Sequence, residues 1–264
     1  MADLLAVAVC SSVAMIIAWF WQQRHRNAGI VDVFWAFGMM LAGPWYAFTG
    51  PAPLGLQWVL AMVTSIWFLR LGSHLLRRFR SEKEDGRYQS MRGAMGRSSG
   101  IGFFLFFQLQ AGFIWVLSLP FWAVAQNTQP KLLFVLGASG FTLLALWGET
   151  TADRQLAKFR GNPANRGLTC RDGWWRYSRH PNYFFEWLHW FAYPLLGIGS
   201  SYQYALWLAP VVMFCFLYFF TGIPFTERHA LQSRGDNFRH YQKTTSAFFP
   251  WWPKTDRSPS KYDN

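Results

Sequence analysis

The chain has 264 residues, of which 52% are hydrophobic, 20% are aromatic and only 14% are charged. Its net charge is +12, but no recognisable nucleic-acid-binding module accompanies the basic residues, so we do not expect nucleic acid as a partner. Cys10, Cys170 and Cys215 stand apart, without a CxxC pair or metal-ligand spacing, so neither disulfides nor a metal site is indicated.

Seven apolar stretches follow one another along the chain. Each is roughly as long as the ~20 residues that cross a hydrocarbon core about 30 Å thick. They cover residues 4–22, 30–49, 55–76, 101–125, 132–152, 183–200 and 203–224. The first lacks a basic leader and a clear cleavage site, so we expect a retained helix. The sequence predicts an all-α, polytopic membrane bundle of about seven transmembrane helices in a single domain, 1–264.

Lys and Arg gather in alternate connections between these stretches and in the C-terminal tail. Of 25 basic residues, only Arg70, inside the third stretch, and Lys131, on the opposite side, depart from this pattern. Basic connections stay in the cytoplasm, so we expect the N-terminus outside and the C-terminus inside. The same charge suits either anionic lipid headgroups or a cytosolic basin for a polyanion such as a nucleotide.

Ionisable residues inside the second and third stretches are candidates for function, because charged groups are costly in a membrane. Arg70, His74, Arg77 and Arg78 share one helix face, which indicates a polar cavity, although the last two can also snorkel to the interface. Asp32 is the lone acid of the second stretch. It is either a protonated hydrogen-bond donor in an apolar setting or an acid stabilised by the helix start.

The fifth and sixth stretches carry two further polar groups. Glu149, Asp153 and Arg160 share a face, consistent with a structural ion pair or with a carboxylate and an arginine facing a phosphorylated ligand. In RYSRHPNYFFEWLHW, Pro181 suits a first helical turn, where its missing N–H costs nothing. The polar residues around that helix start are Arg179, His180, Asn182, Glu186 and His189. The positive end of the helix dipole there is a suitable place for an anion.

Three remaining segments are less specific. Gln108 and Gln110 either touch a substrate or bond between helices. The segment 81–100, which is rich in charge and glycine, is typical of a mobile cytosolic loop that could act as a lid or a solvated linker. The tail after residue 224 predicts a short helix followed by an aromatic anchor.

Five strings together resemble the steroid 5α-reductase superfamily, and above all its bacterial membrane branch of unknown function. They are GIVDVFWAFG, RLGSHLLRR…EDGRY, ADRQLAKFRGNPANRG, WWRYSRHPNYFFEW and TERHAL…FRHYQKTTSAFFPWWP, and they span roughly residues 20–253. The RHPNYFFE string is also similar to sterol reductases and isoprenylcysteine carboxyl methyltransferases.

The resemblance implies an NADPH-dependent reductase in the bacterial inner membrane, with a cofactor site open to the cytoplasm. Its substrate would be a lipophilic, steroid-like α,β-unsaturated ketone. Substrate-side helices would lie within about 1–125, and cofactor-binding helices and loops within about 132–253. The implied cofactor residues are Arg78, Arg87, Asp153, Arg160, Tyr177, Arg179, His180, Asn182, Glu186, Glu227 and Tyr241. We add Glu149 as a cofactor residue because it shares a helix face with Asp153 and Arg160.

For catalysis, Asp32 lies where the family's steroid reductases place a substrate-contacting glutamate. The family tyrosine that would share the carbonyl falls at Leu75, so we expect His74 or Tyr88 to take its place. We expect Trp35, Gln108 and Gln110, together with Asp32, to contact the substrate. No GxGxxG motif follows a strand, so the cofactor would be bound by helices.

Two other functions remain open from the sequence. One is an S-adenosylmethionine-dependent membrane methyltransferase, because that branch shares the RHPNY string. The other is a non-enzymatic lipid-binding or transport protein that uses the same cavity, although no internal repeat or pair of broken helices points to transport. Small-xxx-small spacing is sparse, so we expect a monomer surrounded by membrane lipids.

Overall fold

The computed structural model describes residues 1–81 and 83–255. Within these residues the regular elements are all helical, which confirms the predicted all-α class. Six helical segments of the described chain are long and apolar enough to cross a membrane, which indicates a multi-pass membrane protein.

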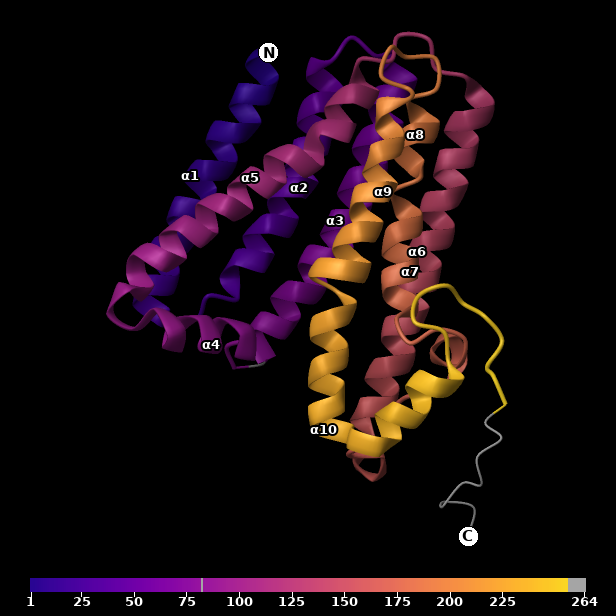
Figure 1. Cartoon of the computed structure of the whole chain (residues 1–264). Coiled ribbons are helices and arrows are strands. Elements are labelled where there is room, and N and C mark those ends of the chain that lie inside the picture. Colours follow the sequence, from indigo (N-terminus) through magenta and orange to yellow (C-terminus); the bar gives the residue numbers. More distant parts are fainter. Residues whose placement is uncertain (82, 256–264) are drawn as a thin grey trace. The chain divides into compact units, whose positions relative to one another are not determined.

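The helices appear in chain order in Figure 1. The α-helices are α1 (Ala2–His25), α2 (Ile30–Thr49), α3 (Leu54–Ser81), α4 (Gly86–Met95), α5 (Ser99–Ala125), α6 (Leu132–Gly161), α7 (Pro181–His189), α8 (Ala192–Leu196), α9 (Leu208–Cys215) and α10 (Ile223–Thr244). The short 3-10 helices are η1 (Gly96–Ser98), η2 (Pro163–Asn165), η3 (Gly173–Arg176) and η4 (Ala205–Trp207), and η5 (Phe216–Phe220) is a π-helix.

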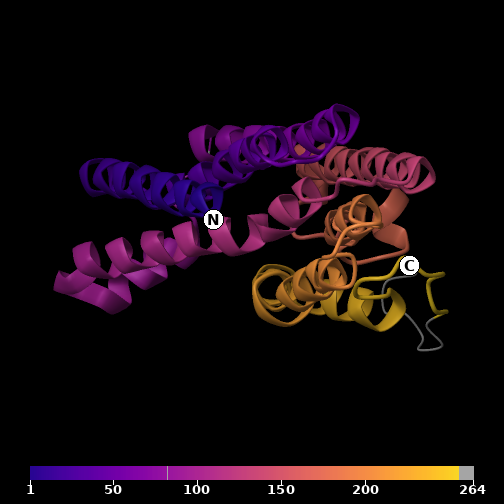
Figure 2. The ribbon, with the colours of Figure 1, turned by 90° about the horizontal axis from the view of Figure 1, so that it is seen from above.

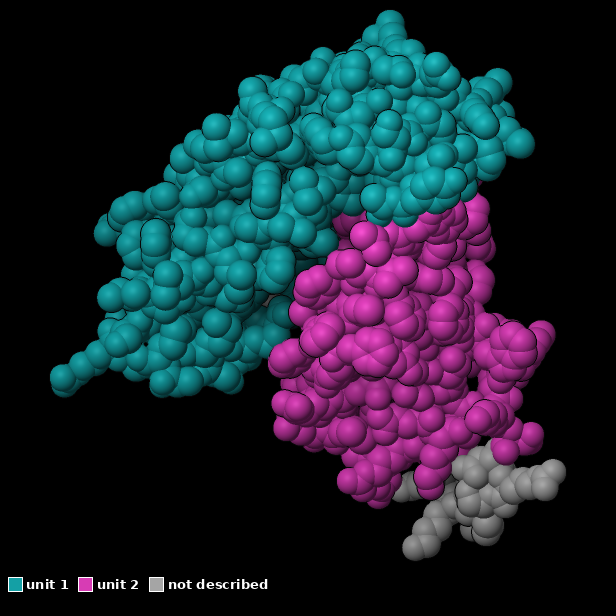
Figure 3. Space-filling view, turned by 45° about the horizontal axis from the view of Figure 1, so that its top comes forward, with its two compact units in different colours: residues 1–139, 193–206 teal, residues 140–192, 207–264 magenta. Residues whose placement is uncertain are grey.

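The chain divides into two compact units, coloured separately in Figure 3. Unit 1 comprises residues 1–139 and 193–206, and unit 2 comprises residues 140–192 and 207 onwards. In unit 1, α1 lies beside α5, and α2 packs against both α3 and α5 (Figures 1 and 2). Helices α2 and α3 approach closely at Gly43, where an added Cβ atom would lie 1.9 Å from Thr64 Oγ1. Small residues allow membrane helices to approach in this way.

Unit 1 presents apolar side chains outward at helical spacing. On α1 the exposed residues are Leu5, Val9, Val13, Ile17 and Phe20. These large hydrophobic residues recur every three or four positions, so they form one stripe along the helix. A stripe of this kind faces lipid in a membrane protein, which agrees with the apolar length of the helix.

Unit 2 contains α6 from residue 140 onwards, together with helices α7, α9 and α10. Helix α6 meets α7 at Gly148, where an added Cβ would lie 2.2 Å from the Phe185 ring. Trp187 on α7 donates its indole N–H to the carbonyl of Pro210 on α9 at 3.0 Å. Residues 245–254 then cross the start of α7, where Ser178 and Ser246 form an isolated parallel bridge. We call residues 245–254 the C-terminal strap.

Two predicted segments differ from the structure. The stretch 183–200 is not one long helix: α7 ends at His189 and the short α8 follows. Pro194 has no N–H to donate to the carbonyl of Trp190, four residues earlier, and its ring crowds that carbonyl, so the helix cannot run on from α7. Gly199, which follows α8, has a φ of +100°. The segment 81–100 was predicted as a loop, but residues 86–95 form α4 because Asp85 caps its first turn.

Candidate functional site

The first cluster of polar residues lies in unit 1, where α2 and α4 begin. Asp32 is in the first turn of α2, and Tyr88 is in the first turn of α4. Tyr88 is 3% exposed and donates its hydroxyl hydrogen bond to Asp32 Oδ1 at 2.8 Å. The Asp32 side chain remains 34% exposed, so part of it is accessible. The two residues therefore form an acid–phenol pair with one side open.

Arginines surround this acid–phenol pair. Arg87 Nη2 lies 3.6 Å from Asp32 Oδ2, and the same guanidinium binds Asp85 through Nε at 3.2 Å. Arg78 of α3 also binds Asp85, at 2.7 Å. Burial acts to raise the pKa of Asp85, but the Arg87 backbone N–H and the charges of Arg87 and Arg78 together hold that pKa below its ordinary value. Asp85 is thus an ionised acceptor at neutral pH.

A small cavity of about 30 Å³ adjoins the pair, with Asp32, Asp85, Leu75 and Arg78 among its lining residues. A volume of this size holds one or two water molecules, so an organic ligand would have to reach Asp32 from outside this cavity. Nearby, Glu84 Oε1 accepts hydrogen bonds from the Ala28 N–H at 2.7 Å and from Arg92 at 2.8 Å. These bonds fix α4 to the turn between α1 and α2.

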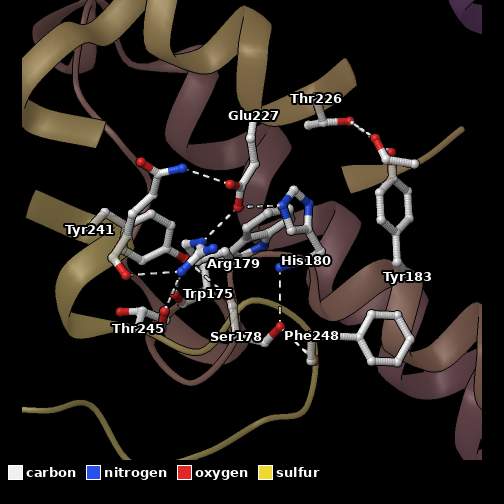
Figure 4. Close-up of polar contacts among 12 residues, drawn as sticks. Trp175, Ser178, Arg179, His180, Tyr183, Thr226, Glu227, Tyr241, Thr245 and Phe248 are labelled. Atoms are coloured by element: carbon white, nitrogen blue, oxygen red, sulfur yellow. Dashed lines mark hydrogen bonds and ion pairs between the residues drawn. The ribbon is translucent and has the colours of Figure 1, made fainter. Parts of the chain in front are cut away.

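The second cluster lies in unit 2 at the start of α7 (Figure 4). Glu227 of α10 accepts three hydrogen bonds: from Arg179 Nε at 2.7 Å, from Gln242 Nε2 at 2.6 Å, and from His180 Nε2 at 3.2 Å when that nitrogen carries the proton. Their side chains are mostly buried, with exposures of 12% for Arg179 and 13% for Glu227. Burial lowers the pKa of His180, and the Arg179 charge acts in the same direction, against the hydrogen bond to Glu227.

This second cluster also fastens the C-terminal strap. Arg179 Nη1 donates to the carbonyls of Gln242 at 3.0 Å and Thr245 at 2.7 Å. Tyr241 is 1% exposed and donates its hydroxyl to the carbonyls of Trp175 and Ser178. Each of these groups is satisfied by the protein itself. Their immediate effect is to hold the start of α7. A ligand would contact only the parts of the Arg179 and Glu227 side chains that remain exposed.

A larger, basic cavity lies in unit 2 after the end of α6. Its volume is about 430 Å³, and its lining includes Arg160, Arg166, Arg234, Asn162 and Asn165. Arg160 comes from the last turn of α6, Arg166 follows η2, and Arg234 belongs to α10. A hydrogen bond within the loop between α6 and η3 fixes its start, because the Asn162 side chain caps η2 by accepting from the Ala164 N–H. Three arginines around one cavity of this size give it the positive charge and the N–H donors that suit phosphate groups.

The other predicted site residues have different surroundings. His74 is exposed on α3, so of the two candidates for the carbonyl partner only Tyr88 is joined to Asp32. Gln108 exchanges hydrogen bonds with Ser12 of α1, the interhelical alternative. The Trp35 ring packs edge-on against Phe68, and Gln110 is half-buried.

The predicted cofactor residues of unit 2 are divided among several places. Glu149 is buried within α6, and Asp153 is half-buried one turn later. Glu186 accepts a hydrogen bond from the Trp190 indole at 3.1 Å. Asn182 is half-buried in the first turn of α7, and the Tyr177 ring packs against Trp252. Of the predicted cofactor residues, Arg160 is the one that lines the basic cavity.

The sequence reasoning missed four residues that shape these sites. Asp85 could have been recognised as a helix cap, because it precedes a glycine and the Arg-Tyr pair. The sequence pattern indicates Arg166 and Arg234 only as part of the basic connections and the basic tail. Gln242 gave no signal, because its role depends on α10 turning back towards α7.

The described part of the chain brings together no group of three or more His, Cys, Asp or Glu side chains that could hold a metal ion. No curated protein and no solved structure gives a significant match to the chain. One family profile matches residues 18–245, which covers both clusters and the basic cavity. The chain therefore belongs to the DUF1295 family, described as "Protein of unknown function".

Proposed function

We propose that this protein is a membrane reductase that uses NADPH to reduce the C=C bond of a lipophilic α,β-unsaturated ketone. The observation that carries the proposal is the hydrogen bond from Tyr88 to Asp32, at 2.8 Å. The resemblance to steroid 5α-reductases assigns a carboxylate with a phenolic partner to the substrate carbonyl. The sequence left that partner open between Tyr88 and His74, and only Tyr88 bonds to Asp32.

The acid–phenol pair is suited to polarising a carbonyl. Asp32 accepts from Tyr88 on Oδ1, which leaves Oδ2 to present a proton to the ketone oxygen when the acid is protonated. Negative charge develops on that oxygen when a hydride is added to the β-carbon. A preorganised donor at such a position contributes about 3–4 kcal/mol to the transition state.

The reaction balances with one hydride and one proton. When bound, NADPH supplies the hydride that the β-carbon accepts. The α-carbon takes one proton, either from water directly or from the Asp32–Tyr88 pair, which water then reprotonates. The small cavity beside Asp32 is large enough for the water that this exchange needs.

The basic cavity of unit 2 would hold part of the cofactor. Its volume of about 430 Å³ lies in the usual range of small-molecule sites, roughly 300–1,000 Å³. Arg160, Arg166 and Arg234 would bind phosphate groups, with Asn162 and Asn165 available to hydroxyl or base edges. A site for S-adenosylmethionine, which carries no phosphate, would not need three arginines.

The remaining assignments follow from the same proposal. The Arg179–Glu227–His180 cluster would set the position of the α7 start against the cofactor. Trp35 and Gln110 would contact the apolar substrate, which would reach the site from the lipid. The basic connections would face the cytoplasm of a bacterial inner membrane, with about seven helices crossing it and the N-terminus outside, and the protein would act as a monomer.

The test is an NADPH-oxidation assay on protein purified in lipid nanodiscs, with progesterone-like enones as substrates. Tyr88→Phe should lower kcat by about 10²–10³-fold, the effect of losing one such donor. Asp32→Ala should lower kcat at least as much. Tyr204→Phe is the matched control, because Tyr204 is 82% exposed in a loop. Full turnover in both Asp32→Ala and Tyr88→Phe would refute the assigned chemistry.

A further inference from the structure

Asp85 is the acceptor on which the first cluster converges. Its Oδ1 accepts from the Arg87 backbone N–H at 2.9 Å and from Arg87 Nε at 3.2 Å. Its Oδ2 accepts from Arg78 Nη2 at 2.7 Å. The side chain is 21% exposed, so solvent screens these contacts only in part. One carboxylate therefore links the end of α3 to the start of α4.

The first consequence concerns where α4 begins. Helix α4 has ten residues, and Tyr88 is its one buried side chain. Short helices gain little from their own hydrogen bonds, so their ends depend on caps and on tertiary contacts. Asp85 caps the turn that contains Tyr88. The cap thereby sets the position of the Tyr88 hydroxyl relative to Asp32.

The second consequence concerns Arg87, which lies between two carboxylates. Its guanidinium is 3.2 Å and 3.4 Å from the Asp85 oxygens but 3.6 Å from Asp32 Oδ2. A full ion pair with Asp32 would require a closer approach, because charge-assisted N–H···O bonds are about 2.7–2.9 Å long. Asp85 holds Arg87 away from this distance. Tyr88 remains the closest donor to Asp32, whose side chain stays 34% exposed.

We propose that Asp85 is a positioning residue for the Asp32–Tyr88 pair: it fixes the first turn of α4 and keeps Arg87 from closing on Asp32. The positioning is a property of the fold, and its effect on turnover rests on the proposed function. The two parts can therefore be tested separately.

The positioning is tested with 3-fluorotyrosine placed only at position 88, whose ¹⁹F resonance reports the surroundings of the hydroxyl. Asp85→Asn keeps a side-chain cap, since Asn and Asp cap helices about equally well, but removes the charge that holds Arg87. We expect Asp85→Asn to displace the resonance. We expect Asp85→Asn combined with Arg87→Gln to bring the resonance back, because the competing cation is gone.

Two outcomes would overturn the positioning role: a wild-type resonance in Asp85→Asn, or a displacement that persists when Arg87 is also removed. Asp236→Asn is the control, because Asp236 is 78% exposed and forms only a surface pair. In the enone assay, Asp85→Asn should lower kcat by about 10–100-fold with little change in the KM for substrate. If the wild-type protein reduces no enone, the proposed function fails, and the ¹⁹F result still decides the role of Asp85.

Discussion

Glu227→Gln removes the negative charge at the centre of the α7 cluster and leaves the shape of the side chain almost unchanged. In the wild type, the two Glu227 oxygens accept from Arg179, His180 and Gln242. An amide at this position has one acceptor oxygen, and its NH₂ group faces a donor. Arg179 then loses its only carboxylate partner among the contacts described, although it keeps the carbonyls of Gln242 and Thr245.

The size of the effect follows from the burial of the pair. Removing one partner of a fully buried ion pair costs about 3–5 kcal/mol. Arg179 and Glu227 keep 12% and 13% exposure, and Arg179 retains two acceptors, so we expect a loss of about 2–3 kcal/mol. For a protein of this size, such a loss lowers Tm by about 4–12 °C.

The assay is thermal unfolding in nanodiscs, followed by tryptophan fluorescence, with hydrogen exchange of the C-terminal strap measured in parallel. Glu227→Gln should lower Tm and speed exchange in residues 245–254, which Arg179 fastens. Asp236→Asn removes an equivalent charge from an exposed pair and should change stability by less than about 0.5 kcal/mol. If Glu227→Gln and Asp236→Asn unfold at the same temperature, the cluster does not stabilise unit 2 and the reasoning is wrong.

Three further outcomes follow. Because the pKa of His180 is lowered in the folded state, the unfolded chain binds more protons, and the free energy of unfolding should fall as the pH drops below about 6.5. Between pH 7.5 and 5, the free energy of unfolding of His180→Gln should depend less steeply on pH than that of the wild type. Gly148→Ala places a Cβ within 2.2 Å of the Phe185 ring and should cost about 1–3 kcal/mol; an unchanged denaturation midpoint would contradict this packing. Gly43→Ala should cost a similar amount against Thr64, and adding Thr64→Ala should recover part of the loss in the same measurement.

The predicted membrane helices agree closely with the structure wherever apolar length is the deciding property. The stretches 4–22, 30–49 and 101–125 lie within α1, α2 and α5. Length and hydropathy failed for 183–200, because Pro194 and the following glycines interrupt a segment that is apolar throughout. They also failed for 81–100, where a polar helix depends on a cap and one buried tyrosine.

The candidate site was predictable by residue type and less so by partner. Asp32 stood out because an acid is rare in an apolar stretch. Its partner was ambiguous. His74 is adjacent to Leu75, where the resemblance places the family tyrosine, whereas Tyr88 reaches Asp32 only once α4 has formed. The arginines of the basic cavity come from three separate segments, and periodicity within one helix cannot bring Arg166 and Arg234 together.

The most direct test of the central claim is a nucleotide titration of the purified protein, read by quenching of its tryptophan fluorescence. We predict saturable binding of NADPH, weaker binding of NADH, and a smaller difference between the two in Arg234→Gln, because that arginine lines the basic cavity. Saturable binding of S-adenosylmethionine without binding of NADPH would contradict the account.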